Sequence, residues 1–588
     1  MCGVFGYVGR ETDVGNSVMT ALKTLEYRGY DSWGLAIAVD GALLVEKDVG
    51  RLNGHRYEFP ASRLGLGHTR WATHGGVTVA NAHPHLDCGG RIAVVHNGII
   101  ENHIELRVAL LARGHHFASE TDSEVVAHLA EERLSAGADL AEAIAEIVDL
   151  LEGFNAIVAI DRETDTMAAA KRTSPLVVGH GPGKITVASD PLALRPHADQ
   201  LVYLDDQHIA VATTNGFEVR NRRSGAAVAP TFVAMQQSAC DAGLGGYPDF
   251  FTKEVSEQPE TLRRIVAHAR SEIEALAKAT GEAERVILVG CGTAANAALA
   301  GTYLFSDVCG RDLTAIPASE FRYRAHHLDA RSLVVALSQS GETIDVLEAA
   351  AHGRAHGARL AAVVNSESST LDRLVDTRVL LRAGVEQCVL ATKSYTAKLA
   401  TLLLTACSVA GRWDDGAAAV LAAADAIERN LRDGMRDQIK AIAERFAGAA
   451  HLFVIGRGVH FPSALEAALK IKEVSYIHAE AFAGGELKHG VIALVTDGTP
   501  CLVFAPDDAT RVDIISGATE LRSRGAVIIG VGNRSDPVFD EFIPIAEAGC
   551  ASPIVEALPG QLLGYFAALA RGNDPDRPRN LAKSVTVK

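Results

Sequence analysis

Cys2 is the earliest residue in this sequence whose type and position could do chemistry. It is a small residue behind an initiator methionine, so removal of Met1 would put a thiol and a free α-amine on one residue. An α-amine has an ordinary pKa of about 7.7–8.0, which suits a general base near neutral pH, and N-terminal-nucleophile enzymes pair the two groups in this way. An ordinary cysteine is the alternative, and the position taken alone favours it.

Five segments of the N-terminal half resemble the class II glutamine amidotransferases. They are residues 2–6 (CGVFG), 28–32 (RGYDS), 68–75 (HTRWATHG), 96–102 (HNGIIEN) and 119–122 (SETD). The resemblance implies that Arg70 pairs with the α-carboxylate of L-glutamine and Asp122 with its α-ammonium, which suits a guanidinium and a carboxylate. It also implies roles for Asn97 and the Gly98 N–H at the oxyanion, for Thr73, His74 and His83 along the glutamine site, and for Arg28 and Trp71 as loop and gate.

Single residues in these segments also have purely structural interpretations. Asn97-Gly98 is a common hairpin-turn pair, and Asp122 could cap the helix that follows it. The ordered occurrence of all five segments favours the catalytic interpretation.

A second set of polar residues lies at 338–343 (SQSGET), between the apolar run 333–337 and a helical pattern. At a junction from strand to helix, hydroxyl and backbone N–H groups converge on a phosphate. A capping turn rich in Ser and Thr explains the same residues equally well. The segment is similar to the phosphate loop of sugar isomerase (SIS) domains, which implies sugar-phosphate contacts from Ser338, Gln339, Ser340 and Thr343.

The order of an amidotransferase half, two SIS units and the tail 578–587 (PRNLAKSVTV) resembles the glucosamine-6-phosphate synthase family along nearly the whole chain. That family aminates fructose 6-phosphate with ammonia from glutamine, passed through an internal channel, and isomerises the product to glucosamine 6-phosphate. It uses no metal and no organic cofactor. The resemblance implies a Schiff base at Lys583, a proton shuttle at Glu473, ring opening by His489, and further sugar-phosphate contacts at Thr293, Glu386, Val389, Lys470 and Ala582.

Without the resemblance these residues have ordinary interpretations. Lys583 would be a solvated lysine of the tail, and His489 a hydrogen-bonded structural histidine. Lys470 and Glu473 would form an i,i+3 surface ion pair, which contributes only about 0.3–0.5 kcal/mol.

Four residues depart from the family's motifs: Trp33, Ala294, Ala391 and Val491. Ala294 and Ala391 stand where serine is usual, and losing one hydrogen bond to a buried ligand hydroxyl costs about 1–3 kcal/mol. A paralogue that aminates a different sugar phosphate therefore stays open as an alternative. From another class, a SIS protein that binds a sugar phosphate for regulation, without transferase activity, stays open too.

The pattern of apolar and polar residues along the chain predicts the domains that hold these sites. Short β-leaning segments such as 34–39 and 91–95, with helical patterns at 18–25 and 123–133, indicate an α+β unit, and the resemblance makes residues 2–235 an N-terminal-nucleophile (Ntn) hydrolase sandwich. A polar linker is predicted at 236–250. Beyond it, apolar strands alternate with helices, which predicts two doubly wound α/β SIS domains with parallel sheets at 251–430 and 431–572, and a tail, 573–588, that closes the sugar site.

The net charge and the cysteine content limit the classes of partner and ligand that we expect. The 588 residues carry a net charge of −16, which argues against a broad nucleic-acid surface. None of the nine cysteines forms a CxxC pair or a zinc-finger spacing, so we expect reduced thiols. The start of the sequence has no basic region followed by an apolar one, and apolar stretches such as 399–411 are too short to span a bilayer, so we expect a cytoplasmic enzyme without membrane segments. The resemblance implies that no metal is used. L-glutamine and a sugar phosphate are the expected ligands, and the resemblance implies a homodimer.

Overall fold

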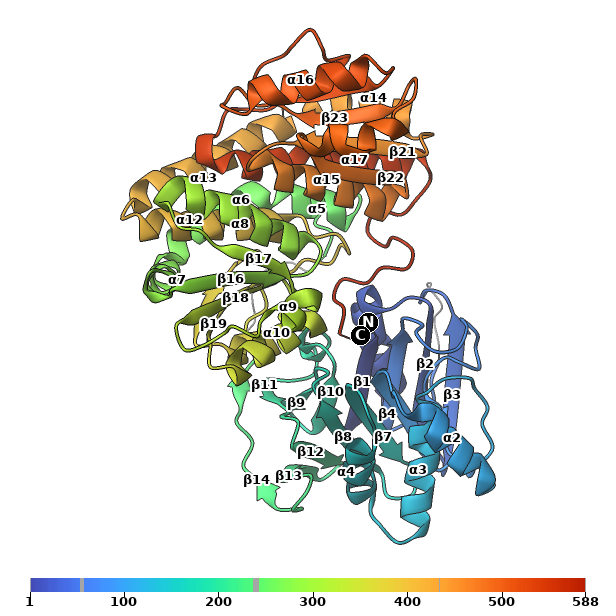
Figure 1. Cartoon of the computed structure of the whole chain (residues 1–588). Helices are drawn as coiled ribbons and strands as arrows, with labels where there is room; N and C mark the ends of the chain where they lie inside the picture. Colours follow the sequence, from blue (N-terminus) through green and yellow to red (C-terminus); the bar gives the residue numbers. More distant parts are fainter. Residues whose placement is uncertain (1, 53–57, 236–242, 433, 587–588) are drawn as a thin grey trace. The chain divides into compact units, whose positions relative to one another are not determined.

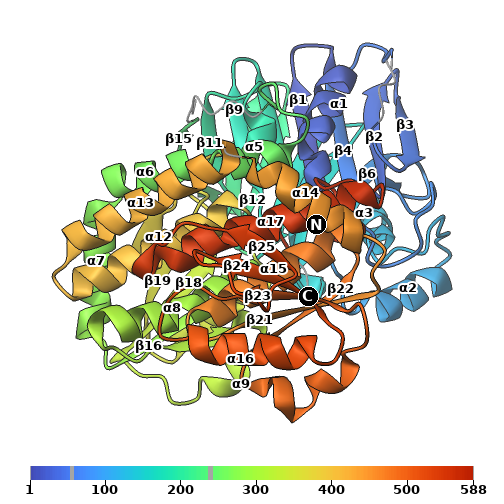
Figure 2. The ribbon, with the colours of Figure 1, turned by 90° about the horizontal axis from the view of Figure 1, so that it is seen from above.

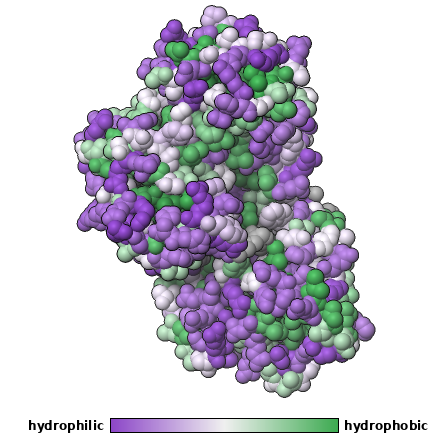
Figure 3. All heavy atoms as spheres, in the orientation of Figure 1, coloured by the Kyte–Doolittle hydropathy of each residue, from purple (hydrophilic) through white to green (hydrophobic). Residues whose placement is uncertain are grey.

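The computed structural model of the chain describes residues 2–52, 58–235, 243–432 and 434–586 (Figure 1). It divides into two compact units, Met1–Ala239 with Ser584–Lys588, and Cys240–Lys583. Each unit is described by itself below. On the face drawn in Figure 3, hydrophilic residues cover most of the surface and apolar residues lie in scattered groups.

The first unit contains two antiparallel sheets. The eight-stranded sheet has the order β15-β11-β9-β10-β1-β4-β2-β3 and the seven-stranded sheet the order β14-β13-β12-β8-β7-β6-β5. The strands are β1 (Gly3–Gly9), β2 (Ser32–Val39), β3 (Ala42–Val49), β4 (Leu64–Arg70), β5 (His85–Leu86), β6 (Ile92–Gly98), β7 (Asn155–Asp161), β8 (Thr166–Arg172), β9 (Val177–Gly181), β10 (Lys184–Ala188), β11 (Gln200–Tyr203), β12 (His208–Thr213), β13 (Gly216–Asn221), β14 (Ala227–Val228) and β15 (Val233–Ala234).

Alternation of side chains along β1 explains the layers of this unit. Val4 and Val8 join the apolar core between the two sheets, whereas Phe5 and Tyr7 point to the opposite face and pack with α1. Successive residues of a strand face opposite sides, so β1 is buried on both. The helices α1 (Val14–Leu25), α2 (His103–Ala112), α3 (Glu124–Ser135) and α4 (Leu140–Leu150) are those of this unit. Since α3 and α4 cover the outer face of the second sheet, the result is an αββα sandwich.

The second unit contains two five-stranded sheets with parallel strands, in the orders β17-β16-β18-β19-β20 and β22-β21-β23-β24-β25. The strands of the first sheet are β16 (Arg285–Gly290), β17 (Thr314–Pro317), β18 (Ser332–Ser338), β19 (Arg359–Val364) and β20 (Thr377–Leu380). Those of the second are β21 (His451–Gly456), β22 (His478–Ala483), β23 (Pro500–Phe504), β24 (Val527–Gly532) and β25 (Glu541–Pro544). Helices on both faces make such strands apolar along their whole length.

Helices of the second unit enclose these sheets. They are α5 (Phe250–Ser256), α6 (Gln258–His268), α7 (Arg270–Glu282), α8 (Thr293–Cys309), α9 (Ala318–Arg324), α10 (Ile344–Ala355), α11 (Thr370–Leu374), α12 (Lys393–Val409), α13 (Trp413–Arg432), α14 (Met435–Phe446), α15 (His460–Ser475), α16 (Arg511–Arg522) and α17 (Ser552–Ala570). Helices α15 and α17 lie side by side, as Figure 1 and Figure 2 both show. A Cβ on Gly560 would come within 2.6 Å of the Ala467 Cβ, so glycine permits this close approach.

Helix α17 has the length and composition to cross a membrane, but 89% of its apolar window within Gly549–Ala570 is buried inside the protein. It is therefore the central helix of a large core shared by both parallel sheets. The predicted fold class, an α+β sandwich followed by two parallel α/β units, is confirmed. The predicted domain limits stay predictions, and residues 236–242 of the predicted linker lie outside the described residues.

Candidate active sites

Cys2 lies directly before β1, whose first residue, Gly3, pairs with Thr69 near the end of the neighbouring strand β4. The Trp71 backbone N–H donates to the Cys2 Sγ at 3.3 Å, and the Ala72 N–H donates to Asp31 at 2.8 Å. Burial raises the pKa of the Cys2 thiol, while the Trp71 N–H and the Arg70 guanidinium act in the opposite direction. The thiol therefore needs a base to become a nucleophile.

Asn97 and Gly98 meet Cys2 from the other sheet. The Asn97 Nδ2 donates to the Cys2 carbonyl at 2.9 Å, and Asn97 Oδ1 lies 3.1 Å from His68 Nε2. Gly98 has a φ of +142°, and a Cβ there would come within 1.9 Å of the Phe154 carbonyl oxygen. Both residues pair with β7 at the end of β6, so they are not in the hairpin turn that their types alone suggested.

The histidines beside Cys2 are poorly suited to act as its base. Burial lowers the pKa of His68 to about 3 and also lowers those of His83 and His96. The His83 Nδ1 accepts from the His96 N–H at 3.3 Å, and the His68 ring stacks on His83 with centroids 4.1 Å apart. Their rings are neutral, and the His96 ring is already hydrogen-bonded to Ser123 and Asn155, which leaves an α-amine on Cys2 as the base that the local chemistry favours.

The two residues predicted to hold glutamine are buried. The Arg70 guanidinium donates to the carbonyls of His74, at 2.5 Å, and Gly75, at 3.2 Å, so a ligand carboxylate would replace loop carbonyls. Asp122 accepts from the Ile100 N–H at 2.8 Å and does not cap α3. The capping alternative for Asp122 is therefore wrong.

The other residues predicted for the glutamine site differ in burial and in their contacts. Thr73 is exposed and His74 half-buried, on the loop that follows β4. Arg28 is buried and donates to Asp190 at 2.8 Å, so it holds the end of α1 to the segment after β10. Trp71 is half-buried, and its backbone is what contacts Cys2.

In the second unit, residues 338–343 do connect β18 to α10. The Ser338 Oγ accepts from the Gly341 N–H at 3.0 Å, and Thr343, at the helix start, makes no capping hydrogen bond with its side chain. Gly341 has a φ of +68°, and a Cβ there would lie 2.0 Å from Ser369 Oγ. The Thr343 hydroxyl therefore does not cap the helix, which fits a phosphate-binding turn better than a structural cap.

The Lys583 side chain is only 4% exposed, contrary to its interpretation as a solvated tail lysine. Its Nζ donates to Glu386 at 2.6 Å and to the Leu390 carbonyl at 3.1 Å. Glu386 also accepts from the backbone N–H groups of Thr392 and Ser394 and from the Ser394 hydroxyl. Burial alone would raise the pKa of Glu386, but Lys583 and two further lysines lower it to about 2. The two predicted residues therefore form one buried ion pair.

Lys470 and Glu473 form a second pair, 2.7 Å apart on α15. Lys470 is only 1% exposed, so this is not the surface bridge that the spacing alone suggested. Burial would lower the pKa of Lys470, but Glu473 and Glu466 raise it. Glu466 accepts from Thr293 Oγ1 at 3.0 Å, so the predicted residue Thr293 on α8 is tied to α15.

His489, Val389 and Ala582 complete the predicted set. His489 is exposed on a short 3₁₀ helix, Glu486–His489, where it makes no hydrogen bond or ion pair with the described residues. The Val389 N–H donates to the Asp576 carbonyl at 3.0 Å. Ala582 is half-buried beside Lys583 in the sequence. The structure thus brings Val389 close to the tail but does not join His489 to Lys583.

Two residues that matter here were not predicted. Glu466 is 1% exposed and accepts from Thr293 and, at 2.8 Å, from Asn296. A carboxylate four residues before Lys470 on an otherwise apolar helix face was a usable signal. Asp31, which fixes the turn after Trp71, lies in the segment 28–32, and that motif was its signal.

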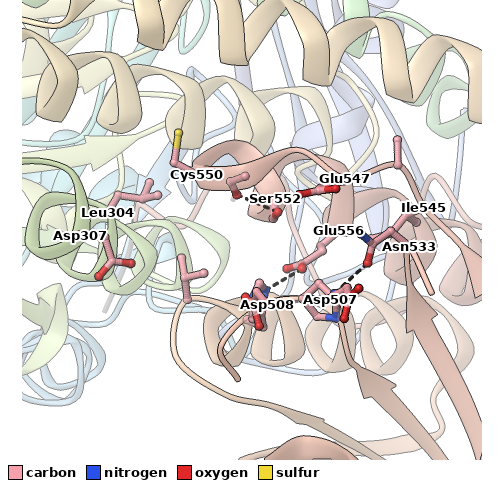
Figure 4. A pocket seen from close by; sticks show the side chains of 15 residues that line it. Leu304, Asp307, Asp507, Asp508, Asn533, Ile545, Glu547, Cys550, Ser552 and Glu556 are labelled. Atoms are coloured by element: carbon pink, nitrogen blue, oxygen red, sulfur yellow. Dashed lines mark hydrogen bonds and ion pairs between the residues drawn. The ribbon is translucent and has the colours of Figure 1, made fainter. Parts of the chain in front are cut away.

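A cavity of about 270 Å³ opens at the carboxyl ends of the second parallel sheet (Figure 4). Figure 4 shows its carboxylates, Asp307, Asp507, Asp508, Glu547 and Glu556. His460 lies between Asp508 and Glu556, with its ring nitrogens 2.7 and 2.6 Å from their oxygens. This negative lining repels a phosphate, and none of the predicted sugar residues lines the cavity.

Comparisons with known proteins cover both units. A glutamine amidotransferase domain model matches residues 68–196, and a SIS domain model matches 281–408 and 445–541. Proteins named glutamine--fructose-6-phosphate aminotransferase [isomerizing] from Streptomyces coelicolor and Thermus thermophilus are 41% and 40% identical, over 100% of this chain and of each relative. A solved C-terminal domain of glucosamine-fructose-6-phosphate aminotransferase from Francisella tularensis is 30% identical with a TM-score of 0.54, and the match covers 57% of this chain and 100% of that one.

Proposed function

The chain belongs to the glutamine–fructose-6-phosphate aminotransferase (isomerizing) family, and from that premise we propose how its own residues carry the reaction. It is an enzyme that uses glutamine to aminate fructose 6-phosphate and isomerises the product to glucosamine 6-phosphate. The observation that carries this function is the full-length identity of about 40% to relatives of that name, across both units.

In the first unit the proposed nucleophile is Cys2. Once Met1 is removed, its α-amine takes the thiol proton, and the sulfur attacks the amide carbon of glutamine. Asn97 Nδ2, with the Gly98 N–H, stabilises the oxyanion, a contribution of about 3–4 kcal/mol for one such donor. Ammonia leaves with a proton from the amine, and water then releases glutamate from the thioester.

For the glutamine itself, the proposed contacts are charge pairs. Arg70 would exchange its bonds to the carbonyls of His74 and Gly75 for bonds to the α-carboxylate. Asp122, held by the Ile100 N–H, would meet the α-ammonium. Because ionised partners make the stronger hydrogen bonds, such an exchange is favourable.

In the second unit the proposed electrophile activator is Lys583. Its amine condenses with the ketose carbonyl and releases water, and ammonia later displaces the amine. A lysine must lose a proton, here to water, before it attacks a carbonyl, and Glu386, 2.6 Å away, holds the Lys583 Nζ in place. Glu473, held by Lys470, would then move a proton between C1 and C2 of the sugar.

Phosphate recognition is assigned to the turn 338–343, supported by the uncapped start of α10. The N–H groups at this helix start and the hydroxyls of Ser338, Ser340 and Thr343 suit a dianion.

Of the two departures from serine, Ala294 is buried among the apolar residues of the core. Its methyl group therefore packs against protein, which weakens the case for a different sugar.

One experiment tests the separate roles that we assign to Cys2 in the first unit and Lys583 in the second. Protein with Met1 removed is incubated with glutamine and fructose 6-phosphate, and glutamate and glucosamine 6-phosphate are measured separately. Equal amounts are expected. Cys2→Ala should lose synthesis from glutamine yet keep synthesis from ammonium salts, and Lys583→Arg should hydrolyse glutamine without making amino sugar. Glutamate without amino sugar from the unmodified enzyme would overturn the proposal.

We propose two further properties of the whole protein, its location and its oligomeric state. Each described cysteine is a free thiol, which agrees with a cytoplasmic location, and cell fractionation tests it. A homodimer is expected from the family resemblance, and light scattering after gel filtration would give a single mass near twice 62.1 kDa. A monomer at working concentration would contradict it.

A further inference from the structure

Four side chains that the proposed reaction does not use converge in the first unit: Cys88, His115, His128 and Glu131. Cys88 belongs to the turn between β5 and β6, and His115 to the loop between α2 and α3. His128 and Glu131 lie three residues apart on α3, hence on one face of that helix. Each residue offers one donor atom, and the four atoms lie within 4.8 Å of one another.

Four of the six distances between these donors are close to those of a tetrahedral metal site. With Zn–S bonds of about 2.3 Å and Zn–N and Zn–O bonds of about 2.0–2.1 Å, neighbouring ligand atoms are about 3.3–3.6 Å apart. The Cys88 Sγ lies 3.7 Å from His115 Nδ1 and 3.5 Å from His128 Nδ1. Glu131 Oε2 lies 3.0 and 3.6 Å from the same two nitrogens. A small ion would fit at the centre with shifts of a few tenths of an ångström.

The second nitrogen of each histidine faces a carboxylate. His115 Nε2 lies 3.3 Å from Glu132, and His128 Nε2 lies 3.6 Å from Glu124. Histidines that bind a metal usually direct the other ring nitrogen to such a partner, which fixes the tautomer and makes the ligand more basic. Both rings thus present the Nδ1 atom to the centre and the Nε2 atom to an acid.

We propose that Cys88, His115, His128 and Glu131 bind a zinc ion. A thiolate with two imidazoles excludes Mg²⁺ and Ca²⁺, which prefer oxygen ligands, and suits the borderline-soft Zn²⁺. Four protein ligands leave no open position, so the site is structural and takes no part in the sugar or amide chemistry. Sequence spacing gave no sign of it, because the ligands come from three separate segments.

The ion would fasten the segment that leads to the glutamine site. Glu124, behind His128, accepts from the Ala118 N–H at 2.7 Å and from the Ser119 hydroxyl at 2.6 Å. This stretch runs directly into Asp122, the proposed partner of the glutamine ammonium. A bound zinc therefore joins the β5–β6 turn, the loop 113–119 and the middle of α3.

The test is the metal content of the full-length protein after gel filtration in metal-free buffer. We expect about one zinc per chain, and below about a tenth of that in Cys88→Ser and in Glu131→Gln. Glu132→Gln should weaken zinc binding about 10- to 100-fold. The matched controls are His116→Ala, an exposed histidine beside His115, and Cys550→Ser, an exposed cysteine of the other unit. Both should keep the full zinc content.

Cobalt gives a second measurement that does not depend on the variants folding well. Protein stripped with a chelator and loaded with Co²⁺ should show a thiolate-to-cobalt charge-transfer band and the strong visible bands of tetrahedral coordination. Unmodified protein that binds neither zinc nor cobalt, or Cys88→Ser protein that still binds zinc fully, would overturn the proposal. Neither result touches the assignment of the reaction, which is measured through glutamate and amino sugar.

Discussion

We expect Glu386→Gln to destabilise the unit Cys240–Lys583 by about 3–5 kcal/mol, because it leaves a buried lysine without its carboxylate. The Glu386 side chain is 0% exposed and that of Lys583 only 4% exposed. Glutamine keeps the shape and can still accept from the N–H groups of Thr392 and Ser394. What it removes is the negative charge that faces the Lys583 ammonium at 2.6 Å.

The pKa of Glu386 points in the same direction. Burial alone would raise it, yet Lys583 and two other lysines lower it from 4.5 to about 2. At about 1.4 kcal/mol for each pH unit, this corresponds to about 3 kcal/mol of stability. A lowered carboxyl pKa contributes stability that is present above the unfolded value near 4.5 and is lost as the pH falls through about 2. The difference between the unmodified and variant proteins should therefore shrink across that window.

Urea denaturation followed by circular dichroism and tryptophan fluorescence measures this effect. Lys583→Met and the double variant complete a cycle, in which the double variant should lose about 0.5–3 kcal/mol less than the sum of the single variants. Glu274→Gln, in an exposed pair with Arg270 on α7, is the control and should leave the midpoint unchanged. A loss below about 1 kcal/mol for Glu386→Gln, or strict additivity in the cycle, would refute the reasoning.

Three further predictions concern other residues. Asn97→Ala should lower glutamine-dependent kcat by about 10²–10³ while synthesis from ammonium salts persists, since one oxyanion donor is lost; steady-state kinetics with both nitrogen donors decide it. Gly98→Ala should abolish glutaminase activity, because its Cβ would come within 1.9 Å of the Phe154 carbonyl oxygen, and an active variant would contradict the assigned backbone. Burial alone would lower the pKa of His460, but Glu556 and Asp508 raise it to about 10. The protonated ring therefore stabilises the fold fully below pH 6.5, and this stabilisation disappears as the pH rises through about 10. Urea midpoints measured between pH 6 and 11 should fall with pH in the unmodified protein, and His460→Gln should remove this dependence.

Local patterns predicted much of this molecule. The apolar runs that alternate with helices specified the two parallel sheets, because a strand covered by helices on both faces must be apolar throughout. The residues around Cys2 were predicted together through the family resemblance, and in the structure Arg70 ends one strand, Trp71 follows it, and Asn97 and Gly98 end another. Here chemistry and local structure coincide within short segments.

Single motifs predicted the burial of charged residues less well. The motifs alone suggest that Lys583 is a solvated tail lysine and that Lys470 and Glu473 form a surface pair. The structure instead buries the side chains of both lysines. Burial depends on what packs over a residue, and neighbours in the sequence do not specify that. Only the family resemblance favoured a functional interpretation of these lysines.

By itself the sequence determined the strands, the helices and the short segments that carry recognisable chemistry, because periodicity and turn residues act within a few positions. Only the tertiary structure decided which distant side chains meet. Glu466 reaches Thr293 through the packing of α15 on α8, and Cys88 reaches His115 and His128 because a turn, a loop and a helix converge. Such contacts depend on strand register and helix packing, which arise from the whole core and not from any one segment.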